Sequence, residues 1–261
     1  NSPVASTDPW ANNFISAHGL RFFTLQDFTV VSNNDNNNFA YLWSLATGPY
    51  NQEWNIKSVE FQGAWNRVIG LDGDATANLN SEMVIDRTST ATNSRFKDAF
   101  FRSGGISGPY NQQNQFLNYW VTNSQFALTQ GTLFRLDRGG SLRVDRGSWS
   151  AVNKTDGPIT FFYMPVANHN NRSAAQLSVR DIRFEPKAAN HKVIDCAWGS
   201  GSITFDDCAD LSSLQYDAAM EFNLHRYVGQ SPWGFGTGPM VMYRNHQGAG
   251  YHLYEGPKQE R

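Results

Sequence analysis

Five acid or amide side chains recur just after short apolar–polar–apolar stretches: Asp86, Asn123, Asp145, Glu185 and Asp206. If these stretches stack as adjacent β-strands, spaced about 4.8 Å apart, the five side chains form one column. Glu185 and Asp206 then approach to about 5 Å, and Asp145 and Asp206 to about 10 Å. Glycoside hydrolysis uses carboxylate pairs at such separations, the shorter for retention and the longer for inversion of configuration. We therefore predict Asp145, Glu185 and Asp206 as candidate catalytic residues.

Arginines near these acids support a second interpretation of the column. Arg143 and Arg183 occupy the outward position of their stretches, and Arg87 and Arg146 directly follow an acid. In the stacked register Arg183 also lies beside Thr204. A guanidinium that pairs with a carboxylate neutralises it, and exposed ion pairs of this kind contribute little to stability. The alternative to a catalytic or metal-binding groove is therefore a solvated, salt-bridged row of turn residues.

Aromatic and polar side chains near the strand ends indicate a different kind of site. Sugars bind with their flat apolar faces on Trp and Tyr rings, flanked by amide, carboxylate or guanidinium groups. Trp149 and Trp198 lie near loops or strand ends, and Asn123, Arg143 and Arg183 are the neighbouring polar candidates. We predict these five as carbohydrate-binding residues. The alternative for the two tryptophans is a place in the core, since aromatic residues dominate burial.

The remaining motifs point to no cofactor. The histidines and the two cysteines, Cys196 and Cys208, lack the fourfold spacing of a zinc site, and His246 and His252 are six residues apart. The segment 72–74 resembles the start of a calcium loop but lacks the rest of that loop, so we predict a tight turn. No phosphate loop, dinucleotide fingerprint or serine-hydrolase elbow occurs. We predict no metal and no cofactor; a disulfide between the two cysteines stays open.

The elements that must position these residues are short strands. The apolar–polar–apolar pattern begins at positions 28, 59, 83, 120, 142, 182 and 203. Such alternation marks strands with one buried face, and its return every twenty to forty residues indicates coils of a solenoid with loops of variable length. We predict an irregular lead-in segment over 1–19, a β-helix over 20–210 and a C-terminal cap or oligomerisation segment over 211–261. The best helix candidate, 213–220, lies in that last segment.

The composition agrees with a β-rich protein that buries a substantial core. The chain has 261 residues, with 18 Phe, 10 Tyr and 8 Trp to supply buried surface. The main alternative fold is an antiparallel jelly roll, because 133–144 has the pattern of a hairpin around Gly139-Gly140. In a solenoid the same glycines would turn one coil into the next.

Charge and hydropathy limit the partners. The formal net charge is −2 and 17% of the residues are charged, which offers no electrostatic footprint for nucleic acid or for an anionic membrane surface. No apolar run reaches transmembrane length. We predict neither nucleic acid nor a membrane as a partner. Because the chain begins with Asn1 instead of methionine, we also expect a processed product or a section of a longer polypeptide.

Two segments carry a family resemblance. Residues 140–145 (Gly-Ser-Leu-Arg-Val-Asp) and 201–206 (Gly-Ser-Ile-Thr-Phe-Asp) resemble rungs of right-handed parallel β-helices, the group of pectate-lyase-like proteins and bacteriophage tailspikes. The resemblance covers residues 20–210. It implies a homotrimer, extracellular or virion-associated, that binds or cleaves surface polysaccharides in a groove lined by carboxylates and aromatics. The calcium-binding acids and the catalytic Arg or Lys of the lyase members have no assigned match here.

Three functions follow from these observations. The first is a virus- or phage-associated, tailspike-like structural protein that recognises a polysaccharide or cell-surface glycan of a host, together with other virion proteins. The second is a polysaccharide-degrading glycoside hydrolase, which requires the acids in a solvent-accessible groove. The third is a jelly-roll capsid or coat subunit, which requires antiparallel pairing across Gly139-Gly140. The first of these is the function we expect.

Overall fold

The computed structural model describes 11–44, 50–73, 80–104, 106, 116–137, 140–165, 175–199, 201–210, 224–228, 239–248 and 252–254. These residues form strands joined by turns, with no helix among them. The strands are β1 (Asn13–His18), β2 (Arg21–Asn33), β3 (Asn38–Ser44), β4 (Asn51–Gly73), β5 (Asn80–Asp86), β6 (Ser89–Thr90), β7 (Arg95–Ser103), β8 (Phe116–Leu128), β9 (Gly131–Leu136), β10 (Gly140–Ala151), β11 (Ile159–Met164), β12 (Gln176–Glu185), β13 (His191–Cys196), β14 (Ser202–Asp206), β15 (Ala209–Asp210), β16 (His225–Tyr227), β17 (Met240–Arg244), β18 (Gln247–Gly248) and β19 (His252–Tyr254).

All strand pairings among the described residues are parallel, and they fall into three ladders. Ladder A contains 21–26, 51–57, 80–86, 116–122, 140–145, 176–180, 202–206 and 240–244. Ladder B contains 28–33, 59–64, 89–90, 124–128, 147–151, 182–185, 209–210 and 247–248. Ladder C contains 13–18, 38–44, 67–73, 95–103, 131–136, 159–164, 191–196, 225–227 and 252–254.

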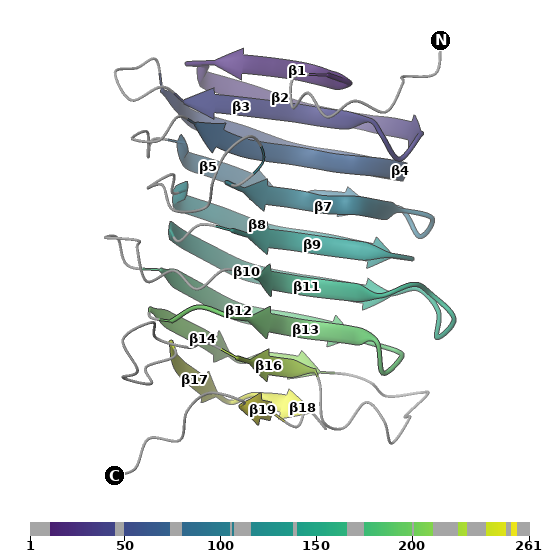
Figure 1. The fold of residues 1–261 in the computed structure, drawn as a ribbon, viewed down its shortest axis with the longest axis vertical. Coiled ribbons are helices and arrows are strands. Elements are labelled where there is room, and N and C mark those ends of the chain that lie inside the picture. The colour runs from purple at the N-terminus through teal and green to yellow at the C-terminus, as the bar shows by residue number, and fades with distance from the viewer. Residues whose placement is uncertain are drawn as a thin grey trace.

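The chain visits the ladders in the order A, B, C, and one segment from each makes a repeat. Strand β4 spans all three ladders in the second repeat, while later repeats divide the same path between strands such as β10 and β11. Figure 1 shows the repeats stacked in chain order along the long axis, from β1 in purple to β19 in yellow. This all-β, parallel arrangement fits a β-helix-like solenoid.

The strands on either side of Gly139-Gly140 do not pair with each other, as the alternative jelly roll would require. Strand β9 pairs with β7 and β11, and strand β10, which begins at Gly140, pairs with β8 and β12. Each strand therefore finds its partner one full repeat away, not across the nearest turn. The described pairings are accordingly not those of an antiparallel jelly roll.

Parallel pairing extends past both of the expected boundaries. Strand β1, within the predicted lead-in segment, pairs with β3, and strands β16 and β17, beyond residue 210, pair with β13 and β14. The helix expected over 213–220 lies outside the described residues. A capping or oligomerisation role for 211–261 stays a prediction.

A continuous row of aromatic rings runs through the core inside the stack. Successive rings contact one another at 4.9 to 6.2 Å between centroids. The row comprises Phe61, Phe100, Phe126, Trp149, Phe184 and Phe205. Each buried ring contributes roughly 1.5–3 kcal/mol through burial, so these side chains hold the ladders in place around the axis.

Candidate functional site

The last position of ladder A carries a row of charged and polar residues, here called the A column. From the second repeat onwards it reads Lys57, Asp86, Thr122, Asp145, Arg180, Asp206 and Arg244. Three of the acids predicted to align are therefore in one column, as expected. Arg180 separates Asp145 from Asp206, because it lies in register with both.

The other two predicted members of the column lie elsewhere. Glu185 is in ladder B, opposite Ser150, five residues beyond Arg180 in the same strand, and Asn123 follows the A-column position instead of occupying it. Arg183 is accordingly opposite Ala209 and not beside Thr204. The prediction that all five side chains share one register was therefore wrong. The tripeptide that ends at Glu185 has the same alternation as the one that ends at Asp145, but it lies on the next face of the repeat.

Each acid of the A column has a cationic or hydrogen-bonding partner. The Asp145 carboxylate lies 3.2 Å from Arg180 Nε, and that of Asp206 lies 2.9 Å from Arg244. The Asp86 carboxylate accepts hydrogen bonds from Thr122 Oγ1 at 2.7 Å and Asn123 Nδ2 at 2.9 Å. Burial opposes ionisation of Asp86, but these hydrogen bonds and the adjacent guanidinium hold its pKa below the usual value. The column is a row of compensated charges.

A left-handed residue follows the A column in every repeat and turns the chain from ladder A into ladder B. The φ angles lie between 48° and 61° at Asp27, Ser58, Arg87, Asn123, Arg146, Asp181, Asp207 and Asn245, here called the corner column. Residues other than glycine rarely adopt this conformation, and Asn and Asp tolerate it best. The corner skips one residue in the hydrogen-bonded register and starts ladder B on a new face.

A second polar row lies two residues beyond the corner, in ladder B. Paired positions there are Thr29, Glu60, Ser89, Gln125, Ser148 and Arg183, here called the B column. Two of the residues predicted to bind carbohydrate, Asn123 and Arg183, thus belong to the corner and B columns. Glu185 forms an ion pair with Arg183 in the same region. The two columns run side by side along the stack.

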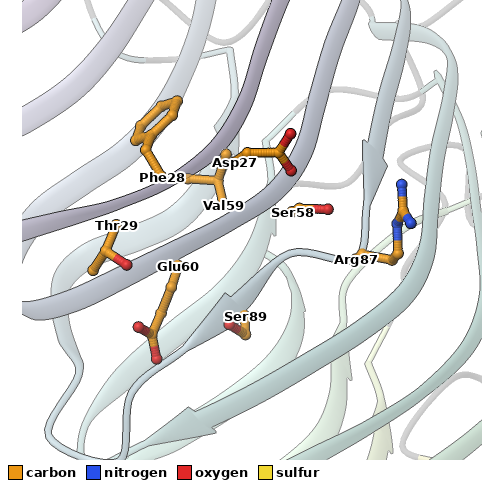
Figure 2. Close-up of a pocket in the computed structure, with 8 residues that line it drawn as sticks. All are labelled: Asp27, Phe28, Thr29, Ser58, Val59, Glu60, Arg87 and Ser89. Atoms are coloured by element: carbon orange, nitrogen blue, oxygen red, sulfur yellow. The ribbon is translucent and has the colours of Figure 1, made fainter.

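Between these two rows, the first three repeats form a pocket of about 320 Å³. Figure 2 shows its lining, which is the equivalent segment of each repeat: Asp27, Phe28 and Thr29; Ser58, Val59 and Glu60; Arg87 and Ser89. Carboxylate, guanidinium and hydroxyl groups line the pocket, while the Val59 side chain is buried in the core and Phe28 packs against that core. Such a lining can hydrogen-bond a polyhydroxylated ligand.

None of the five residues predicted to bind carbohydrate lines this pocket. The rings of Trp149 and Trp198 are fully buried in the core, where Trp149 packs against Phe126 and Phe134. They act as core residues, not as platforms for sugar. Arg143 is exposed on ladder A, in register with Trp120 and Ser178.

An ion network on ladder C was not predicted from the sequence. Asp98 accepts from Arg67, Arg102 and Arg135 at 3.0 to 3.1 Å, and Asp137 accepts from Arg102 and Arg135 at 2.7 and 3.1 Å. Gly70 makes room for it, because a Cβ atom there would lie 2.4 Å from Arg67 Nε. Burial opposes the ionised form of Asp98, but the three guanidiniums hold its pKa below the usual value. The network ties three repeats together.

A second missed cluster lies inside the last two repeats. Asp210 Oδ2 is 2.7 Å from His225 Nε2 and 3.0 Å from His246 Nε2, and all three side chains are almost completely buried. Burial disfavours the carboxylate of Asp210, but the two histidines hold its pKa below the usual value. The three residues are 15 and 21 positions apart in the sequence, so no local motif could have revealed them.

The two cysteines are buried free thiols. Burial raises the pKa of Cys196 to about 12 and that of Cys208 to about 11. Both thiols therefore stay protonated near neutral pH, and neither is poised for nucleophilic chemistry.

Comparisons with known proteins give no assignment: no family model, no curated protein and no solved structure matches this chain. Within the part of the chain that the structure describes, no helix is long and apolar enough to cross a membrane.

Proposed function

We propose that this protein is a right-handed parallel β-helix that recognises carbohydrate on a cell surface, as a tailspike-like structural protein of a virus or phage. The observation that carries the proposal is the pocket between the corner and B columns. Its lining of Asp27, Glu60, Arg87 and three hydroxyl side chains matches the hydrogen-bonding groups of a glycan. The polar rows continue beyond the pocket through Asn123 and Arg183, so a chain of sugars could lie along the stack.

The backbone that presents these groups suits recognition by a pre-formed surface. Asp27, Ser58 and Arg87 belong to consecutive repeats whose strands are hydrogen-bonded to one another on both sides of the corner. The side chain of Val59 is buried in the core and fixes the strand that presents Ser58 and Glu60. The binding surface therefore loses little conformational entropy when a ligand binds. Right-handed crossover is the expected hand for parallel strands joined in this way.

The positions of the predicted catalytic acids favour binding over cleavage. Asp145 and Asp206 flank Arg180 in the A column, and Glu185 lies on the next face with Arg183 as its partner. Hydrolysis uses two carboxylates that face the same glycosidic bond, and each of these three acids faces an arginine instead. We therefore propose a glycan receptor in preference to a glycoside hydrolase that uses these three acids.

The proposal is tested by measuring how the full chain binds neutral and acidic hexose oligosaccharides on an array, followed by calorimetry of the best ligand. Glu60→Gln and Arg87→Gln each remove a charged hydrogen-bonding group and are expected to weaken binding by about tenfold or more. Glu53→Gln is the matched control, because Glu53 is a partly buried acid outside the pocket. It should leave affinity unchanged.

Two outcomes would overturn the proposal. One is the absence of binding to any oligosaccharide by a folded chain; the other is an affinity that neither pocket substitution changes. The trimeric, virion-associated state belongs to the same proposal, and light scattering of the intact chain measures it directly. A chain that stays monomeric at all concentrations would contradict the trimeric, tailspike-like part of the proposal. The glycan site would still be tested separately by the binding measurements.

A further inference from the structure

We propose that Asp210, His225 and His246 bind a divalent transition-metal ion that fastens the last two repeats of the stack together. The three ligand atoms all lie within 4.8 Å of one another. Two imidazole nitrogens and a carboxylate oxygen are a donor set that zinc and other first-row divalent metals accept. The inference is independent of the proposed glycan site, which lies in the first three repeats.

The spacing of the donors suits an ion after a small adjustment. Tetrahedral coordination at zinc distances of 2.0–2.1 Å places neighbouring ligand atoms about 3.3 Å apart. The carboxylate oxygen of Asp210 is now 2.7 Å from His225 Nε2 and 3.0 Å from His246 Nε2. The ligand atoms therefore need to move apart only slightly to admit the metal.

A hydroxyl group fixes the orientation of one ligand. The Tyr243 hydroxyl is 3.0 Å from His225 Nδ1, which leaves Nε2 directed at Asp210, and it is itself 2.5 Å from the Tyr227 hydroxyl. Histidines that bind metals usually donate the N–H of their other ring nitrogen in a hydrogen bond. In the metal-bound form, His225 Nδ1–H would donate to the Tyr243 oxygen, and the lone pair of Nε2 would face the metal. The Phe205 ring packs against both imidazoles and supplies an apolar surround.

An unsatisfied oxygen gives independent support. Asp210 Oδ1 is buried and has no hydrogen-bond partner among the described residues, although the side chain is completely shielded from solvent. A buried carboxylate oxygen left in this state costs free energy, and such groups are rare in native proteins. A metal ion held between Asp210 and the two imidazoles would satisfy the second oxygen through bidentate coordination.

The placement of the ligands explains what the metal would do. Within one repeat, Asp210 is the last residue of the ladder B segment and His225 is the first residue of the ladder C segment. His246 lies between β17 and β18 of the next repeat. Each repeat of a stack contacts only its neighbours, so the interfaces between repeats carry much of the stability. Three ligands from two repeats would cross-link these two repeats.

The test uses the untagged full chain, stripped with chelator and titrated with zinc chloride by calorimetry, with cobalt(II) as a spectroscopic probe. We expect one ion per chain and a rise in melting temperature of about 5 °C at hundredfold excess over the dissociation constant. Cobalt should give visible d–d bands that zinc abolishes. His246→Gln and Asp210→Asn should each lower zinc affinity at least tenfold, whereas His18→Gln, on the exposed surface of β1, should not.

The alternative is a hydrogen-bonded cluster that binds no metal. Absence of zinc uptake and of cobalt bands in the folded wild-type chain would overturn the proposal, as would binding that survives His246→Gln unchanged. The cobalt spectrum of the wild type decides the question even where a buried variant fails to fold.

Discussion

Two groups of arginines and aspartates occupy the same stack at similar distances but in different surroundings. In the A column, the arginines that pair with Asp145 and Asp206 are 58 to 61% exposed. In the ladder C network the arginines around Asp98 are 4 to 23% exposed, and Asp137 is fully buried. Contact distances alone would rank the two groups as equals. Burial is what separates them.

The difference follows from solvent and from the number of partners. Exposed ion pairs are screened by water and salt, and each contributes about 0–1 kcal/mol. Within the network, the desolvation of each charge is offset only because every carboxylate meets two or three guanidiniums. Removing one member leaves the others buried without compensation. The network should therefore be fragile to single substitutions, and the A column should tolerate them.

The largest expected effect is that of Asp98→Ala. It removes the carboxylate with which Arg67 pairs and leaves Arg102 and Arg135 to share Asp137, and should destabilise the fold by about 3–5 kcal/mol. Urea unfolding followed by tryptophan fluorescence measures the change. Asp206→Ala is the control in the A column, with an expected cost of about 1 kcal/mol or less. Equal losses for the two variants would show that burial does not separate the two groups.

A smaller effect is expected on acidification. The folded-state pKa of Asp98 lies below its usual value of 3.8, so its contribution is fully present above that pH and is lost as the pH falls through the folded-state pKa. The melting temperature of the wild type should therefore fall from about pH 4 downwards. Asp98→Asn already lacks this contribution and should show a shallower decline. Parallel curves for the two proteins would contradict the prediction.

The smallest effect is expected for the pair of Asp145 and Arg180. A double-mutant cycle with Asp145→Asn and Arg180→Gln should give a coupling of about 0–1 kcal/mol at low salt. In 1 M sodium chloride the coupling should approach zero, because the pair is exposed. A coupling above about 2 kcal/mol that persists in salt would show that this exposed pair behaves like the buried ladder C network.

Much of the fold was predictable because it depends on local alternation. The apolar–polar–apolar stretches predicted an all-β chain, and their return along the sequence predicted parallel stacking, which the described strand pairings confirm. Alternation has a period of two and is the same in every ladder, so it could not distinguish Glu185 in ladder B from Asp145 in ladder A. The left-handed residue Asp181, which separates the two faces of β12, carries that information.

The sites depended on what the repeats bring together. Trp149 looks like a surface candidate beside a loop, yet its ring lies in the aromatic core, because the strand register decides which side of the backbone faces inward. The pocket combines Asp27, Glu60 and Arg87 from three repeats, and Asp210 meets His225 and His246 across two.

By itself, the sequence determined the strands, their parallel stacking and the presence of recurring acids. Only the tertiary structure decided which side chains are neighbours, because adjacent rungs come from positions more than twenty residues apart, joined by loops of unequal length. A shift of one residue at a corner changes every contact that follows it. The stacking of the repeats buries the ion network around Asp98 and places His225 and His246 beside Asp210.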